Sequence, residues 1–418
     1  MPNAGSFPNP QESRLEHDIS QLSEFVDHNY EGWTRLAFTD MYTRARLWLK
    51  ALMESAGLDT YVDAAANRIG RLDGNNPGLP PIVIGSHIDT VKGGGRFDGT
   101  VGVLAGIEVV RLLQEHQITL EHTLEIIDFT AEEPTEFGIS TIGSKALAGN
   151  LSEQMLDLRD PAGRSLAEAI RGGGGSPEEI TALVRGQDDI AGYLELHIEQ
   201  GPMLERTKNE LGVVCGIVGI VRLMLQITGS PDHSGTTPMN LRRDTLTGAA
   251  EMILALERLC GSPASAPLVG TVGRILVSPN APNVIAGETR LDVEIRSTDQ
   301  SVMETTADLL LSECRRIARQ RRLSLHSRRM SYTNPVNIQP EILELVRSAC
   351  TEVTDRQIDI MSGAGHDANQ IADIAPAGMI FVPSAGGKSH CPEEFTDIRY
   401  IAKGTAALLR CAAALDTL

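Results

Sequence analysis

The sequence has few cysteines and no pattern among them. Six cysteines occur in 418 residues, and they are scattered along the chain without a CxxC pair. Small secreted domains that depend on disulfides use cysteine densely, so this spacing indicates reduced thiols and a cytoplasmic protein. A chain of this length can bury a large hydrophobic core and needs no covalent cross-links to remain folded.

Long hydrophobic runs and an excess of basic residues are also missing. No apolar run approaches the roughly 20 residues that cross a bilayer, and the polar residues 1–20 do not look like a signal peptide. The 37 basic residues are outnumbered by 55 acidic ones, which gives a net charge of −18. Such a surface repels nucleic acid and anionic membranes. We therefore expect a soluble protein without nucleic-acid or membrane partners.

One arginine-rich segment, residues 315–329, could override the acidic surface. Apolar residues alternate with its arginines, and this pattern is typical of a helix that runs into a strand with the arginines facing water. We interpret the segment as an ordinary solvated surface rather than a nucleic-acid site.

Hydrophobic periodicity predicts an α/β domain with a largely parallel sheet, because short buried strands alternate with helices. The strands are expected at 82–84, 124–129, 194–198 and 379–382. The helices are expected at 15–26, 41–56, 101–115 and 342–350.

A different pattern separates the two parts of this domain. Alternating strands are expected at 220–228 and 288–295, a strand of mixed pattern at 323–332, and helices at 245–259 and 302–319. Such a strand–helix–strand–helix–strand order is typical of a small α+β sandwich. The sequence thus predicts a catalytic domain formed by 1–216 and 332–418, with an α+β domain inserted at 217–331.

Five potential metal ligands lie at or shortly after the ends of predicted strands, where open α/β sheets bind their ligands. They are His87, Asp98, Glu133, His197 and His390. Any one of them alone is more often an ordinary polar residue than a ligand, but five in this pattern are hard to explain by chance. Imidazole and carboxylate without thiolate suit zinc, manganese, cobalt or nickel.

Neighbouring residues supply what metal-assisted hydrolysis needs. The carboxylate of Asp89 can orient His87, because metal-binding histidines usually donate their second N–H to such a partner. Glu132 directly precedes Glu133, so one carboxylate can bind metal while the other takes a proton from water. Residues 93–99 (GGGRFDG) form no P-loop; their glycines instead allow a tight turn that presents Asp98.

Several motifs together carry a resemblance to a known family. They are GSHIDTV, GGGRFDG, EEPTEFG, LELHIEQGP, DHSGTTPM, PNVIAGETRLDVEIRS, SGAGHDA and GGKSH. In order and spacing they resemble the M20-type amidohydrolases, and within these the N-carbamoyl-L-amino-acid hydrolases, allantoate amidohydrolases and β-ureidopropionases. The likeness extends from about residue 34 to residue 396.

The resemblance implies a site for two divalent metal ions per subunit, with zinc as the first expectation and manganese, cobalt or nickel as alternatives. His87 and His197 would bind one ion, and Glu133 and His390 the other, with Asp98 bridging both. Glu132 matches the family's general base, and Asp89 the partner that orients the metal centre.

The resemblance also implies the substrate-binding residues. His233, Asn283 and Arg296 of the inserted domain match residues that bind the substrate carboxylate and stabilise the oxyanion. Gln200 and the backbone of Gly363 and Ala364 match positions that line the carbamoyl pocket. The inserted domain would act as a lid and would form a homodimer.

The expected reaction is cleavage of the ureido C–N bond of an N-carbamoyl-L-amino acid. Allantoate or N-carbamoyl-β-alanine hydrolysis remains open, as does an M20-type dipeptidase or aminoacylase, although HIEQGP and Gln200 argue against a peptidase. A metal-free binding protein is a further alternative that the complete ligand set disfavours. Some positions depart from the family pattern and bear on the substrate; they are Ala286, Glu294, Lys388 and Cys391.

Overall fold

The computed structural model describes residues 7–418. The first six residues, part of the N-terminal stretch interpreted above as lacking a signal peptide, lie outside the described residues. The chain divides into two compact units. The large unit consists of the chain up to Cys215 together with Ile338–Leu418, and the small unit is Gly216–Asn337.

A nine-stranded mixed sheet has the strand order β1-β2-β4-β3-β5-β13-β6-β11, with β12 paired with β6. It is central to the large unit, except that β11 and the end of β6 with which it pairs belong to the small unit. The strands are β1 (Asp59–Val62), β2 (Arg68–Leu72), β3 (Ile82–Ser86), β4 (Leu124–Asp128), β5 (Gly192–Ile198), β6 (Leu211–Ile217), β11 (Val336–Asn337), β12 (Gln357–Ser362) and β13 (Ala377–Val382). The neighbours β4, β3, β5 and β13 are all parallel. Their carboxyl ends therefore meet at one edge of the sheet.

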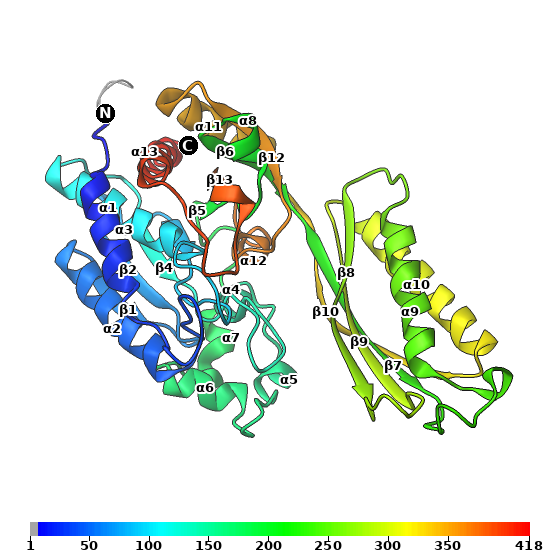
Figure 1. Ribbon diagram of the computed structural model, residues 1–418. Coiled ribbons are helices and arrows are strands. Elements are labelled where there is room, and N and C mark those ends of the chain that lie inside the picture. The colour runs from blue at the N-terminus through cyan, green and yellow to red at the C-terminus, as the bar shows by residue number, and fades with distance from the viewer. Residues whose placement is uncertain (1–6) are drawn as a thin grey trace. The chain divides into compact units, whose positions relative to one another are not determined.

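Long helices cover this sheet (Figure 1). They are α1 (Glu12–Leu22), α2 (Asp40–Ser55), α3 (Thr100–Glu115), α11 (Pro340–Val353) and α13 (Ile398–Leu415). One of them, α1, packs on α3 and α13 rather than on the strands. Almost every residue of α3 is buried, because it lies between the sheet and the helices α1 and α13. The shorter helices are α4 (Ile142–Leu147), α5 (Glu153–Leu156), α6 (Leu166–Gly172), α7 (Ile180–Leu183), α8 (Met203–Thr207) and α12 (Ala368–Ile371).

The small unit is an antiparallel four-stranded sheet with two helices on one face (Figure 1). The strands, in the order β10-β7-β9-β8, are β10 (Ser324–Thr333), β7 (Gly219–Thr228), β9 (Glu288–Ser297) and β8 (Leu268–Ser278). The helices are α9 (Thr245–Cys260) and α10 (Gln300–Gln320). Every second residue of β9 is buried against the helices, so its other side chains line the uncovered face.

The α/β architecture with an additional antiparallel sheet confirms the predicted fold class, but one strand was not predicted. β8 lies at the edge of its sheet and most of its residues are exposed, so it lacks the alternation that identifies a half-buried strand.

The arginine-rich segment spans the end of α10 and β10 as expected. Two of its arginines pair with acidic neighbours, Arg316 with Glu313 and Arg321 with Glu251. Among the described residues, no helix is long and apolar enough to span a membrane.

Candidate metal centre

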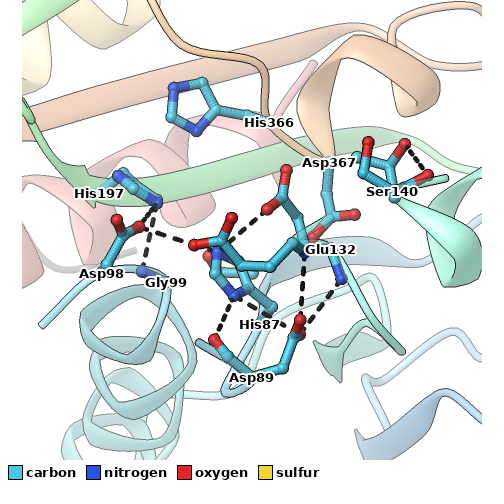
Figure 2. Close-up of polar contacts among 12 residues, drawn as sticks. His87, Asp89, Asp98, Gly99, Glu132, Ser140, His197, His366 and Asp367 are labelled. Carbon is cyan, nitrogen blue, oxygen red and sulfur yellow. Dashed lines mark hydrogen bonds and ion pairs between the residues drawn. The ribbon is translucent and has the colours of Figure 1, made fainter. Parts of the chain in front are cut away.

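The five predicted ligands come together at the carboxyl edge of the parallel strands. His87 follows β3 directly, Glu133 lies after β4, His197 is near the end of β5, and His390 is in the loop after β13. Asp98 lies between β3 and α3. Figure 2 shows His87, Asp98, His197 and Glu132 gathered at one place. Parallel pairing explains this meeting, because it brings the ends of strands distant in sequence to the same edge.

Asp98 belongs to two separate groups of metal-ligand atoms. One group is His87, Asp98 and His197, and the other is Asp98, Glu133 and His390. Asp98 Oδ1 lies 3.1 Å from His197 Nε2 and 3.9 Å from His87 Nε2. Asp98 Oδ2 lies 3.2 Å from His390 Nε2, which is in turn 3.2 Å from Glu133 Oε1. Asp98 Oδ1 thus faces the group with His87 and His197, and Asp98 Oδ2 faces the group with Glu133 and His390.

Main-chain oxygens determine the orientation of two imidazoles. His87 Nδ1 lies 3.0 Å from the main-chain oxygen of Asp89, and His197 Nδ1 lies 2.8 Å from that of Ile198. A carbonyl oxygen only accepts, so each Nδ1 carries a hydrogen. Nε2 of each ring then faces Asp98, which is the arrangement of metal-binding histidines.

Asp89 organises the site through two different groups. Its main-chain oxygen accepts from His87, whereas its carboxylate oxygen lies 3.6 Å from that ring. The carboxylate instead accepts the main-chain N–H groups of Glu132 at 3.2 Å and Glu133 at 3.1 Å. The side chain of Asp89 therefore positions the expected base Glu132, and its backbone positions His87 (Figure 2). The same side chain also holds the backbone of Glu133, a predicted metal ligand.

Carboxylates and imidazoles shift each other's pKa values strongly. Burial lowers the pKa of His87, but the carboxylates around it, Glu132 foremost, hold it well above its usual value. Burial also lowers the pKa of His390, but the hydrogen bonds and charges of Asp98 and Glu133 outweigh burial and raise it to about 11. Burial raises the pKa of Asp98, yet His197 and His390 hold it well below its usual range. A metal cation bound here would favour the ionised carboxylates and the neutral imidazoles.

Gln200 also lies at the metal centre. Its side-chain Nε2 donates to Asp98 Oδ2 at 2.7 Å and lies 3.4 Å from His390 Nε2. Its Oε1 is buried and has no hydrogen-bond partner within residues 7–418. Gln200 Oε1 is therefore a hydrogen-bond acceptor without a partner among the described residues, next to the carboxylate of Asp98.

The loop after β12 carries Gly363 and Ala364. The Ser362 hydroxyl accepts the main-chain N–H of Ala364 at 3.2 Å. Two residues further on, the ring of His366 packs edge-on against that of His197, with 4.5 Å between their centroids. This contact places the loop beside the metal centre.

His233, Asn283 and Arg296 belong to the small unit. His233 and Asn283 are neighbours, because a β-bridge joins His233 to Val284 and Ser234 donates to the main-chain oxygen of Asn283 at 3.1 Å. Arg296 is near the end of β9, and its Nε donates to Glu294 at 2.7 Å.

Two residues near the metal centre had not been predicted. The buried Glu394 accepts main-chain N–H groups of Phe97 at 2.9 Å and Asp98 at 3.0 Å. The Ser389 hydroxyl lies 2.9 Å from Glu394 and 2.8 Å from Asp98. Glu394 thus connects the Asp98 loop to the His390 loop, almost 300 residues apart in sequence. No periodicity marks it, and only its position four residues after His390 could have suggested it.

A third cluster of buried groups consists of Glu195, His197 and His366. Glu195 accepts from the hydroxyls of Ser86 at 3.0 Å and Tyr193 at 2.8 Å. Through Ser86, Glu195 links β5, the strand of His197, to β3, which His87 follows. Its position two residues before His197 was a usable signal, since alternate residues of a strand share a face.

Comparisons with known proteins identify the family to which this chain belongs. The model of peptidase family M20/M25/M40 matches residues 83–414. An N-carbamoyl-L-amino-acid amidohydrolase of Paenarthrobacter aurescens is 38% identical, over 97% of this chain and 98% of that protein. A ureidoglycolate hydrolase of Arabidopsis thaliana is 35% identical, over 94% and 84%. The crystal structure of a hydantoinase/carbamoylase family amidase from Burkholderia vietnamiensis has a TM-score of 0.90 at 32% identity, over 99% of both chains.

The chain therefore belongs to the M20/M25/M40 peptidase family. Its similarity to N-carbamoyl-L-amino-acid amidohydrolases covers nearly the whole of both chains, which confirms the resemblance inferred from the motifs. It is an enzyme of the hydrolase class whose relatives act on C–N bonds other than peptide bonds.

Gly99 provides a test of how closely the Asp98 loop packs on His87. A Cβ atom at Gly99 would lie 2.3 Å from His87 Nε2, and the residue has φ +66°. Gly99→Ala should lower metal affinity about tenfold or more, because His87 must move. The control is Gly138→Ala, which has φ +80° but open space around the new atom. Equal metal affinity of the two variants, measured by competition with a chelating dye, would contradict this account.

Glu394 provides a second test. Glu394→Ala leaves two buried N–H groups without an acceptor, so the free energy of unfolding should fall by about 2–4 kcal/mol. Metal affinity should fall too, because the same N–H groups position Asp98. The exposed neighbour Glu393 supplies the control Glu393→Ala. Urea unfolding and metal titration that did not distinguish the two variants would remove Glu394 from the metal centre.

Proposed function

We propose that the protein is a two-metal amidohydrolase that cleaves the ureido C–N bond of an N-carbamoyl-L-amino acid. The products would be the amino acid and a carbamate that decomposes to ammonia and carbon dioxide. The observation that carries the proposal is the position of Asp98, whose two oxygens face two groups of ligand atoms. The nearly full-length similarity to N-carbamoyl-L-amino-acid amidohydrolases supports the substrate class.

The donor set fits two divalent cations. Each group combines carboxylate oxygen with imidazole nitrogen and has no thiolate, which suits zinc first and manganese, cobalt or nickel as alternatives. His87 and His197 would hold one ion, Glu133 and His390 the other, and Asp98 both. Bound metal ions would polarise the scissile carbonyl and make a water molecule more acidic.

Glu132 is proposed as the general base. Its Oε2 lies 3.6 Å from His87 Nε2. Its main-chain N–H donates a hydrogen bond to the Asp89 carboxylate, which holds the backbone in place. Burial raises the pKa of Glu132 well above its usual value, with Glu133 adding to this and His87 opposing it. In its ionised form this carboxylate can take a proton from the attacking water and return it to the departing nitrogen.

Gln200 supports a carbamoyl substrate rather than a peptide. Its unpartnered Oε1 can accept from the terminal NH₂ group of a ureido substrate, which a peptide bond lacks. Its Nε2 remains bonded to Asp98, so the amide is held in one orientation. The Gly363–Ala364 loop beside His197 is proposed to line the same pocket.

His233 is proposed to stabilise the oxyanion. The main-chain N–H groups of Gly235 and Thr236 donate to its Nδ1 at 3.0 and 3.2 Å. Nδ1 is therefore the acceptor, and the ring hydrogen is on Nε2 of an exposed side chain. An exposed Nε2–H can donate to negative charge that develops on the scissile carbonyl oxygen. The neighbouring Asn283 and, further along the unit, Arg296 are proposed to bind the substrate carboxylate.

The small unit is proposed to act as a lid and to form a homodimer. His233 lies beyond the end of the sheet where β9 begins, and Arg296 is near the other end of β9. The strand from Glu288 to Arg296 spans about 26 Å, which is far longer than a ureido acid. His233 and Arg296 of one small unit are therefore badly placed to contact the same substrate. In a dimer, the small unit of one subunit could supply His233 and that of the other subunit Arg296.

A cytoplasmic location is also inferred. All six cysteines are free thiols, and three of them, Cys314, Cys350 and Cys411, are buried. A protein with this many free thiols is suited to a reducing compartment.

Ammonia release by the metal-reconstituted protein tests the proposal. The panel contains N-carbamoyl-L-amino acids, N-carbamoyl-β-alanine, allantoate and ureidoglycolate, with dipeptides and N-acyl amino acids assayed for amino-acid release. We expect turnover of N-carbamoyl-L-amino acids that a chelator abolishes. Preference for allantoate or ureidoglycolate would reassign the substrate within the ureido class. Turnover of peptides or acyl amino acids alone would contradict the proposal.

Complementation tests the shared active site. Glu132→Gln should keep both metal ions but lose turnover, and His233→Ala should also be nearly inactive. After the two variants are unfolded and refolded together, about a quarter of wild-type activity should return, since half the dimers are mixed and each has one complete site. A mixture that stays inactive although mixed dimers form would show that His233 acts within its own subunit.

Arg296→Ala tests the carboxylate contact. Loss of a bidentate charged pair should raise KM by a factor equivalent to roughly 2–4 kcal/mol and change kcat little. Arg290→Ala, which removes an arginine from the same strand, is the control. Steady-state kinetics in which Arg296→Ala matches this control would exclude Arg296 as the substrate-carboxylate ligand.

A further inference from the structure

The peptide groups on either side of Ile88 are buried just beyond the end of β3, between His87 and Asp89. Because β3 has already ended, no neighbouring strand in the described part of the chain pairs with them. Side chains bond them instead. Asp128 Oδ1 accepts the main-chain N–H of Ile88 at 3.1 Å, and Arg35 Nε donates to its main-chain oxygen at 2.7 Å. Two buried side chains thus hold the two peptide groups.

This short segment influences a large part of the metal centre. On one side of Ile88 is His87, a proposed ligand. On the other side is Asp89, whose carboxylate accepts the main-chain N–H groups of Glu132 and Glu133. Figure 2 shows His87, Asp89 and Glu132 in contact. A shift of the peptide groups at Ile88 would therefore move the imidazole and, through Asp89, both glutamates.

Arg35 is a buried cation without a counter-ion in contact. It lies between α1 and α2, and its side chain is 1% exposed. Within residues 7–418 its guanidinium bonds only to main-chain oxygens. Burial lowers the pKa of Arg35 to about 10, against the charges of Asp89 and Asp128, so it remains charged at neutral pH. A buried charge of this kind costs stability, so packing alone does not explain it.

The donors of Arg35 contact two different segments. Nη1 donates to the main-chain oxygens of Leu22 and Phe25, at 3.1 Å each, where α1 ends. The last carbonyl groups of a helix lack intrahelical partners, so these contacts stabilise the fold. Nε alone donates to Ile88 and thus to the segment of the metal centre.

We propose that Arg35 is a positioning residue of the metal centre, and that it acts through the contact between its Nε and the main-chain oxygen of Ile88. This contact fixes the peptide group between Ile88 and Asp89, while Asp128 fixes the one between His87 and Ile88. The imidazole of His87 and the carboxylate of Asp89 are thereby held in place. The inference rests on the proposed two-metal site and adds Arg35 to the residues that determine it.

Two substitutions separate the Nε contact from the charge and from the contacts with α1. Arg35→Gln places an amide nitrogen at the position of Nε but removes the charge and both Nη groups. Arg35→Lys keeps the charge and an ammonium group near the oxygens of α1, but it has a carbon atom at the position of Nε. A positioning role predicts that glutamine preserves the metal centre and lysine does not. A role in charge balance or in holding α1 predicts the reverse.

The experiment reconstitutes the full-length variants with Co²⁺. The d–d absorption spectrum reports the geometry of the ligands, and competition with a chelating dye gives the affinity. Arg35→Lys should lower the affinity about tenfold or more and change the spectrum, because His87 and Asp89 are no longer fixed. Arg35→Gln should keep both close to wild type, although its free energy of unfolding in urea should fall.

Either variant can overturn the inference. Wild-type affinity and spectrum in Arg35→Lys would do so, and this result is decisive on its own if Arg35→Gln does not fold. An equal loss of affinity in two folded variants would also do so, because the Nε position would then make no difference.

Arg185 provides a matched control in the same unit. Its Nη1 donates to Glu125 Oε2 at 2.7 Å near the beginning of β4, whereas Asp128 is at the end of that strand. Arg185→Lys should leave the Co²⁺ affinity and the spectrum unchanged. An effect equal to that of Arg35→Lys would show a general consequence of replacing an arginine in this unit and overturn the inference. A wild-type protein that binds fewer than two Co²⁺ ions would instead overturn the proposed two-metal site.

Discussion

The carboxylate of Asp98 is the constraint on which the rest of the metal centre depends. Its two oxygens face two sets of ligands that arrive from different strands, so its position must satisfy both at once. The structure holds it from several directions. Gly99 allows the loop to lie against His87, and Glu394 bonds the loop's backbone. Gln200 and Ser389 donate to the carboxylate itself. Because these contacts already hold the Asp98 carboxylate in position, it would need to move little when a metal ion binds.

The two units divide the chemistry of the protein between them. The large unit brings the proposed metal ligands and Glu132 together at the edge where its parallel strands end, and those strands are buried. The small unit carries the groups proposed to recognise substrate, with His233 beyond one end of its sheet and Arg296 near the other. Within that unit, ion pairs such as that between Arg222 and Glu294 connect neighbouring strands.

Sequence patterns predicted the buried strands of this molecule well, but they missed its exposed edge strand and the polar contacts between distant loops. The strands before His87 and Glu133 are short apolar runs, and the chemistry of hydrolysis points to the polar residues that follow them. β8 escaped prediction because an exposed edge strand has no hydrophobic alternation. Glu394 escaped because its contacts join loops almost 300 residues apart, which local sequence does not encode. For Asp89, the residue was predicted, but which of its groups contacts His87 depends on backbone geometry.

The most direct test of the central claim is the metal content of three proteins after equilibrium dialysis, determined by elemental mass spectrometry. With Asp98 as the shared ligand, the wild type should bind about two ions per chain, His390→Ala about one, and Asp98→Ala close to none. Circular dichroism would verify that each variant is folded. Retention of one tightly bound ion by Asp98→Ala would show that one of the groups binds metal without the shared carboxylate and would contradict the account.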